Sequence, residues 1–118
     1  MSVQRGDVVL VEFPFPAGTG SKLRPALVVQ NDDNSSRLAN TIIAAITSTT
    51  HRSGQPTQLL IAVSTAEGQQ SGLLFDSVVT CENLATIDKT LIRRKIGKLP
   101  PATMAKVNDC LKASLGLS

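Results

Sequence analysis

Two short apolar runs, residues 25–30 and 41–48, constrain most strongly how this chain can fold. Their hydrophobic residues follow one another instead of alternating with polar ones. A strand with one face in water alternates, whereas a continuous apolar strand is covered on both faces. We therefore predict that these runs are central strands of a sheet, or strands at an interface.

The rest of the chain is predicted to be mainly β. Residues 8–13 are rich in β-branched side chains, which is typical of a strand. Further strands are expected at 58–64, 77–82 and 91–99, with 84–88 as a short continuation or a turn. Segments rich in Gly, Pro, Asn, Asp and Ser predict a long loop at 14–23, a turn at 31–36, and loops at 49–57 and 66–72.

The C-terminal segment has the pattern of an amphipathic helix. Proline is favourable in the first turn of a helix, so the helix is expected to begin at Pro100-Pro101. Apolar residues then recur at spacings of three and four, at Met104, Val107, Leu111 and Leu115, and Gly116 is a natural terminator. The stripe is interpreted as core packing. Short strands, many turns and a closing helix favour a small, strongly curved barrel.

Composition limits the size and the class of the protein. A chain of 118 residues suits one domain over residues 1–118. The formal charge of +3 permits a polyanionic partner without requiring one. The sequence has no apolar run of membrane-spanning length and no signal-peptide stretch, so we expect a soluble, cytoplasmic protein with no membrane partner.

Cysteine and aromatic residues argue against two kinds of site. Cys81 and Cys110 are far apart, and neither has a second cysteine nearby, so we expect buried, reduced thiols and no zinc site. The aromatic residues are Phe13, Phe15 and Phe75. A platform that stacks the bases of a single strand normally uses several aromatic faces. Nucleic-acid binding is therefore expected to rest on charge, hydrogen bonds and groove shape.

Arg24 stands at the start of the first apolar run, and Thr47 and Ser48 close the second. If the two strands are neighbours, a cation and two hydroxyl groups converge on one spot. A guanidinium makes two parallel hydrogen bonds to a phosphate and keeps its charge. The combination points to RNA chemistry. The alternatives are that Arg24 pairs with an acid and that Thr47 is a β-favouring residue on a half-buried face.

Six segments, in order along nearly the whole chain, resemble the MazF/PemK toxin family. They are Arg5-Gly6-Asp7-Val8, Arg24-Pro25-Ala26-Leu27-Val28-Val29-Gln30-Asn31-Asp32, Ala44-Ala45-Ile46-Thr47-Ser48, Asp76-Ser77-Val78-Val79, Thr86-Ile87-Asp88-Lys89 and Leu115-Gly116-Leu117. The resemblance implies an SH3-like barrel with a C-terminal helix, and a homodimer. It implies a ribosome-independent endoribonuclease that cuts single-stranded RNA at short sequences, and an antitoxin whose acidic segment occupies the RNA groove.

The resemblance also implies roles for particular residues. Arg24 and Thr47 match the catalytic pair. RNA-binding positions match Thr19, Gly20, Ser21 and Lys22 in one loop, Ser48, His51, Gln55, Pro56 and Gln58 in a second, and Asp76, Ser77, Glu82 and Asn83 near the dimer seam. Phe75 departs from the family, because several relatives carry a charged residue there. The loop tip from Gly18 to Lys22 is also particular to this chain, so the cleavage sequence is not carried over.

The residue that accepts the proton from the attacking 2′-OH is left open. Arginine stays protonated, and a single histidine, His51, excludes a two-histidine relay within one subunit. His51 either contacts RNA or is a solvated loop residue. Asp76 or Glu82 would serve as a base if its pKa were raised. Otherwise, Asp76 fixes a turn and Glu82 pairs with a base, and alignment and charge stabilisation supply most of the acceleration.

A basic run near the C-terminus also has two interpretations. Lys89, Arg93, Arg94, Lys95 and Lys98 either contact phosphates in part or form a solvated strand face. The acidic residues are scattered, so we expect no metal and no cofactor.

Two other functions are considered. One is a non-catalytic toxin of the same fold that poisons DNA gyrase by protein contact. The other is a general RNA-binding barrel, which the scarcity of aromatic residues disfavours. Arg24 and Thr47 together favour the nuclease, because a protein that only binds does not need both.

Overall fold

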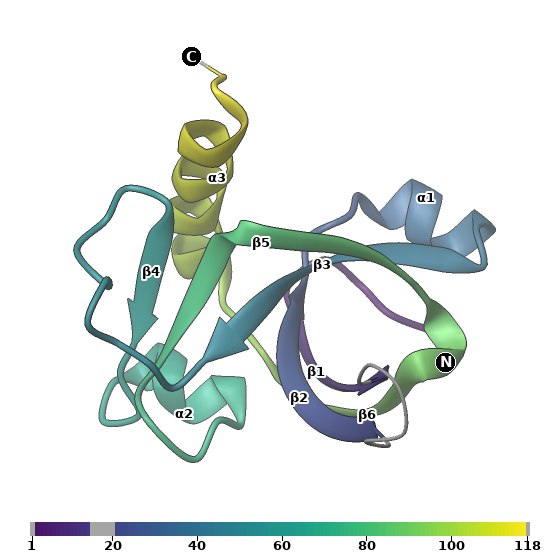
Figure 1. Cartoon of the computed structure of the whole chain (residues 1–118), viewed down its shortest axis with the longest axis horizontal. Coiled ribbons are helices and arrows are strands. Elements are labelled where there is room, and N and C mark those ends of the chain that lie inside the picture. The colour runs from purple at the N-terminus through teal and green to yellow at the C-terminus, as the bar shows by residue number, and fades with distance from the viewer. Residues whose placement is uncertain (1, 15–20, 118) are drawn as a thin grey trace.

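The computed structural model describes residues 2–14 and 21–117. Its strands are β1 (Asp7–Pro14), β2 (Ser21–Val28), β3 (Asn40–Thr47), β4 (Gln58–Ile61), β5 (Ser77–Asp88) and β6 (Ile92–Lys98). Its helices are α1 (Asp32–Arg37), α2 (Ala66–Ser71) and α3 (Pro101–Leu115), with a 3₁₀ turn, η1 (Lys89–Leu91). The strands form one sheet in the order β4-β5-β3-β2-β1-β6, in which every neighbouring pair is antiparallel (Figure 1).

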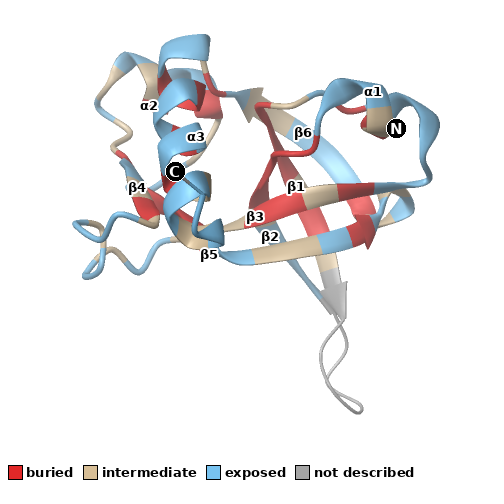
Figure 2. Cartoon of the chain, turned by 90° about the horizontal axis from the view of Figure 1, so that it is seen from above, coloured by how far each residue is buried: buried red, intermediate tan, exposed pale blue. Residues whose placement is uncertain are grey.

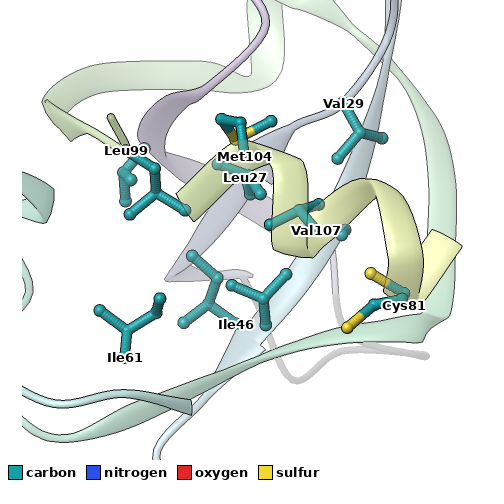
Figure 3. Close-up of a cluster of buried hydrophobic side chains, with 12 residues drawn as sticks. Leu27, Val29, Ile46, Ile61, Cys81, Leu99, Met104 and Val107 are labelled. Atoms are coloured by element: carbon teal, nitrogen blue, oxygen red, sulfur yellow. The ribbon is translucent and has the colours of Figure 1, made fainter. Parts of the chain in front are cut away.

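The two continuous apolar runs are central strands, as predicted. β2 and β3 lie in the middle of the sheet, and residues 25–30 and 41–47 are buried or half-buried. Leu27 and Ala44 face a core that includes side chains of α3 (Figure 3). Ala26, Val28 and Ile43 belong to a second core enclosed by the curve of the sheet. Consecutive buried residues along these strands (Figure 2) therefore serve two cores, which explains why they do not alternate with polar residues.

The sheet is strongly curved, and the mainly β fold with a C-terminal helix is as predicted (Figure 1). The described strands do not close the sheet, because β4 and β6 are its two edges. Much of the bend lies in β5, where the pairing jumps from Ala44–Leu84 to Ala45–Thr80. The residues inserted between these pairs, 81–83, break the ladder and turn the strand, as β-bulges do.

The C-terminal helix packs as its pattern predicted, except at its end. Met104 and Val107 are buried, Leu111 is half-buried, and Leu115 is exposed, so Leu115 is not part of the core. Gly116 ends the helix in the left-handed conformation, with φ of 70°. Cys81 and Cys110 are buried and free, as expected, and burial raises the pKa of the Cys81 thiol to about 12.

Two predicted loops are wrong, because they contain short helices. The turn expected at 31–36 is largely α1, whose N-cap Asn31 accepts a hydrogen bond from the N–H of Asn34 at 2.8 Å. The loop expected at 66–72 is largely α2, which begins after the N-cap Thr65. Asn, Asp, Ser and Thr favour turns and helix N-termini for the same reason, since their side chains bond to nearby backbone N–H groups.

Strand ends also differ from the prediction. β4 stops at Ile61 rather than Ser64, whereas β5 continues through 84–88, which is one of the two outcomes expected for that segment. The loop expected at 14–23 is shorter at both ends, because β1 reaches Pro14 and β2 begins at Ser21. In the described part of the chain, no helix has the length and apolarity needed to cross a membrane.

Candidate functional site

Arg24 of β2 and Thr47 of β3 lie at the same end of the sheet. The ladder between the two strands ends at the pair Ala26–Ala45, and Arg24 and Thr47 each lie two residues beyond that end of the pairing. Both side chains line one cleft with a volume of about 610 Å³. Arg24 is exposed and Thr47 is half-buried. The structure thus brings the guanidinium and the hydroxyl to one solvent-accessible place.

The Thr47 hydroxyl is oriented by the backbone two residues further along the chain. The N–H of Thr49 donates a hydrogen bond to Thr47 Oγ1 at 3.1 Å. A hydroxyl has one proton and two lone pairs, so accepting this bond leaves its proton available as a donor. Thr47 is therefore arranged to donate to an acceptor in the cleft.

The charge of the cleft is positive. Its basic lining residues come from β2 and β6 and are Lys22, Arg24, Arg94 and Lys95, and none of the described lining residues is acidic. Lys95 Nζ lies 3.1 Å from Oδ1 of the buried Asp7, which offsets part of its charge. Hydroxyl groups of Thr47, Ser48 and Ser77 line the same cleft. Cations and hydroxyl donors without carboxylates suit a phosphodiester.

The basic run near the C-terminus divides into two parts. Arg94 and Lys95 face the cleft, which fits the phosphate interpretation for part of the run. Arg93 instead pairs with Glu12, and Lys89 donates to the carbonyl of Ser35 at 2.6 Å. The sequence showed the charges but not this division. Adjacent residues of a regular strand point to opposite faces, whereas Arg94 and Lys95 both line the cleft in β6, whose pairing with β1 shifts register.

The segment 75–77 is fixed by two hydrogen bonds beside the cleft. The Ser77 hydroxyl donates to the carbonyl of Phe75 at 2.8 Å, so its proton is used within the protein. Asp76 Oδ1 accepts from the N–H of Val63 at 2.8 Å. Asp76 therefore ties its own segment to the segment that follows β4.

Glu82 joins the bend of β5 to the loop at 49–57. Its carboxylate accepts from Thr57 Oγ1 at 2.6 Å, from both terminal nitrogens of Arg52 at 2.7 Å, and from Gln58 Nε2 at 3.2 Å. The Thr57 and Arg52 hydrogen bonds lower the pKa of Glu82 to about 2. The raised pKa that a general base would need is absent, so the structure argues against Glu82 as the base. We call these four residues the Glu82 clamp.

The sequence reasoning missed Arg52 and Thr57, because nothing in a polar loop indicates which of its residues will reach a distant strand. Other predicted RNA-binding residues do not line the cleft. His51, Gln55, Pro56 and Asn83 are exposed, and Gln58 is buried in the clamp. Thr19 and Gly20, and the side chain of Ser21, lie outside the described residues.

A second hollow, of about 660 Å³, adjoins the cleft. It is lined by Ser48, Thr50, Val63, Leu74, Phe75 and Asp76. Ser48, Leu74 and Phe75 line both spaces. Over residues 2–14 and 21–117, no three His, Cys, Asp or Glu side chains gather into a group that could hold a metal ion.

Comparison with known proteins identifies the family. Residues 4–115 match the model of the PemK-like, MazF-like toxin of type II toxin–antitoxin systems. The chain belongs to this toxin family. The match includes Arg24, Thr47 and every residue of the Glu82 clamp, because all of them lie within the matched range.

Individual relatives extend the comparison over the whole toxin. Endoribonuclease EndoA of Bacillus subtilis (strain 168) is 35% identical over 118 residues, which cover 99% of this chain and 97% of the relative. A solved structure of a mycobacterial endoribonuclease in complex with its cognate antitoxin is 26% identical, with a TM-score of 0.72 and coverage of 99% and 96%. The MazE-MazF structure (Form-III) from Deinococcus radiodurans has a TM-score of 0.78 at 21% identity, with both chains fully covered.

These comparisons bear on the predicted fold and on the alternatives. The toxin has the fold of MazF, as the Deinococcus structure shows, although its described sheet is open. The curated relative is an endoribonuclease, and nothing among these proteins supports a gyrase poison. The gyrase alternative is therefore set aside.

Proposed function

We propose that this toxin is a sequence-specific, ribosome-independent endoribonuclease that cleaves single-stranded mRNA and so inhibits translation and growth. One observation carries the proposal: Arg24 and Thr47 line the same positively charged cleft. Membership of the toxin family and the similarity to an endoribonuclease over the whole chain support it. We further propose that residues 1–118 act as one domain and that the protein works in the cytoplasm, where mRNA is.

The cleft supplies what cleavage by the RNA itself requires. The 2′-OH attacks the adjacent phosphorus, the bond to the 5′ oxygen breaks, and a 2′,3′-cyclic phosphate and a 5′-OH result. Arg24 stabilises the charge that builds on the phosphoryl oxygens through its planar fork. Thr47 adds a hydrogen bond from the proton that its bond with Thr49 leaves available.

Proton transfer is assigned to no residue of the clamp. A carboxylate with a pKa of about 2 is a weak base and stays unprotonated at neutral pH, so Glu82 is poorly suited to accept the proton. Alignment of the 2′-OH with the leaving oxygen and stabilisation of the phosphoryl charge carry most of the rate enhancement. No metal ion or cofactor is required in this scheme.

The partners follow from the same charge. We propose that an acidic antitoxin binds the toxin, as the mycobacterial relative's structure contains a cognate antitoxin. The basic cleft has the charge to attract an acidic segment, which would compete with RNA. A homodimer is proposed on the family resemblance, with RNA recognised by the loops at 17–23 and 49–58.

The direct test incubates the purified toxin with a long single-stranded RNA and maps the ends of the products. We expect cuts at one recurring short sequence, leaving a cyclic phosphate and a 5′-OH. Arg24→Ala and Thr47→Ala should each lower the rate on the order of a hundredfold to a thousandfold, as removal of a donor to a developing charge does. Intact RNA with the folded wild-type protein would contradict the proposal.

Matched variants separate chemistry from folding. Arg24→Lys keeps the charge but loses the planar fork of the guanidinium. Thr47→Ser keeps the hydroxyl, so it should retain more activity than Thr47→Ala. Lys106 is an exposed residue of α3, so Lys106→Gln should leave cleavage unchanged. Cleavage should persist in excess EDTA. Loss of activity with the chelator and recovery with magnesium would overturn the metal-independent mechanism.

A further inference from the structure

Phe75 is a large apolar side chain held in an exposed position. It is 68% exposed, and its neighbour Leu74 is 83% exposed. Phe75 lines both the cleft that contains Arg24 and the adjoining hollow. An aromatic ring on the boundary of two spaces, one of them suited to phosphate, is placed to contact a nucleotide from the side.

The backbone that carries Phe75 is anchored on both sides. The Ser77 hydroxyl holds the Phe75 carbonyl at 2.8 Å, and Asp76 holds the N–H of Val63 at 2.8 Å. Upstream, Gly72 lies so close to β6 that a Cβ atom would stand 2.0 Å from the carbonyl oxygen of Ile96. The exposed ring therefore sits on a fixed support, which lowers the entropy cost of binding.

The two spaces differ in charge, as the phosphate and the base of a nucleotide do. The cleft has four basic lining residues and no described acidic one. The hollow has no described basic lining residue, but it has the carboxylate of Asp76 and the hydroxyls of Ser48 and Thr50. A carboxylate repels phosphate, but it accepts hydrogen bonds from the exocyclic amine of a base. The cleft thus suits a phosphate and the hollow suits a base.

We propose that the hollow is a base-binding subsite for a nucleotide next to the scissile phosphate, with Phe75 as its stacking surface. The proposal rests on the proposed nuclease function and deepens it. The preferred base carries an exocyclic amine, which donates to Asp76. Stacking on one ring is sequence-tolerant, so Asp76 and the hydroxyls supply the selectivity while Phe75 supplies affinity.

The absence of tryptophan from this chain makes the stacking directly measurable. Phe75→Trp places a lone indole at the site, and a stacked base quenches its fluorescence. The probe is an RNA that contains the mapped cleavage sequence, with a 2′-O-methyl group blocking the attacking oxygen. We expect quenching in Phe75→Trp and none in Leu115→Trp, which places an exposed indole near the end of α3.

A series of Phe75 variants distinguishes stacking from mere apolar contact. Phe75→Tyr should bind the blocked RNA like the wild type, whereas Phe75→Ala and Phe75→Leu should both lose on the order of tenfold to a hundredfold in affinity. The loss should vanish when one base of the RNA is replaced by an abasic residue, which identifies the nucleotide that occupies the hollow.

Several outcomes would overturn the subsite. They are an unquenched indole, a Phe75→Leu variant that binds like the wild type, or a loss that persists at every abasic position. A Phe75→Ala variant that changes only the elution volume in gel filtration would instead assign the ring to an interface between copies of the toxin. If the wild type cleaves RNA in any of these cases, the nuclease function stands and only the subsite fails; if it cleaves nothing, the function itself has failed.

Discussion

Glu82 illustrates how its neighbours decide what a carboxylate can do. The side chain lies near the surface, yet it accepts hydrogen bonds from Thr57, Arg52 and Gln58. These donors stabilise the charged form, so they lower the pKa to about 2. The residue therefore holds a loop in place instead of moving protons. Thr47 shows the opposite case, because the hydrogen bond that its hydroxyl accepts from the N–H of Thr49 leaves its proton available.

The Glu82 clamp predicts a pH-dependent contribution to stability. Because the folded pKa is lowered, the contribution is complete above the pKa of the unfolded chain, about 4.3, and is lost as the pH falls through about 2. Glu82→Gln should therefore lower the Tm at pH 7, and the difference from the wild type should shrink as the pH approaches 2. Thermal unfolding by circular dichroism measures both.

Asp109→Asn is the control for simple loss of a negative charge, since Asp109 is exposed on α3. Its Tm difference should be small throughout the range. If the difference for Glu82→Gln were instead constant with pH, the clamp would not depend on the ionised carboxylate.

At the scale of elements, short helices and tight contacts position the cleft. α2 ends at Gly72, which has φ of 74° and begins the segment that carries Leu74 and Phe75. Gly97 of β6 is close to the same region, because an added Cβ atom would stand 2.3 Å from the carbonyl oxygen of Gln70. The backbones of α2 and β6 therefore touch with no side chain between them, and this contact sets one wall of the cleft.

Replacing Gly72 tests this wall. Gly72→Ala should lower the free energy of unfolding by at least about 2 kcal/mol, because a non-glycine residue in the left-handed region costs about 1–2 kcal/mol and its Cβ atom would also overlap the backbone of Ile96. Chemical denaturation measures the change. Gly54→Ala is the matched control, since nothing lies within 4 Å of its added Cβ atom. Equal effects of the two variants would contradict the close contact.

At the scale of the whole molecule, one sheet separates two cores and gathers positive charge at one end. One core lies between the sheet and α3, and the other lies inside the curve. The basic residues of the cleft come from strands at the centre and at the edge, since β2 supplies Lys22 and Arg24, and β6 supplies Arg94 and Lys95. The curvature of the sheet places them around one space.

This arrangement predicts how salt weakens RNA binding. With 2′-O-methyl RNA, the logarithm of affinity should fall linearly with the logarithm of salt concentration, with a slope no steeper than about −3 if each of the four lining cations neutralises one phosphate at about 0.7 per contact. Arg94→Gln should reduce the slope by about 0.7, and Lys106→Gln on α3 should not change it. Fluorescence anisotropy titrations measure the slopes, and an unchanged slope for Arg94→Gln would place that residue outside the RNA path.

The sequence by itself determined the central strands, the C-terminal helix and the buried cysteines, and it singled out Arg24 and Thr47, which the structure brings to one cleft. These features depend on local patterns, such as continuous apolar runs, helical spacing and the family segments. It could not separate the turns from α1 and α2, because the same polar residues serve both.

Only the tertiary structure decided the contacts between distant segments. Glu82 is clamped to Arg52 from 30 positions away, and Phe75 stands at the meeting of two spaces that several elements line. Such pairings depend on how the bend in β5 and the curvature of the sheet bring remote residues together. No periodicity along the chain encodes them, because their free energy arises only once the two cores have packed.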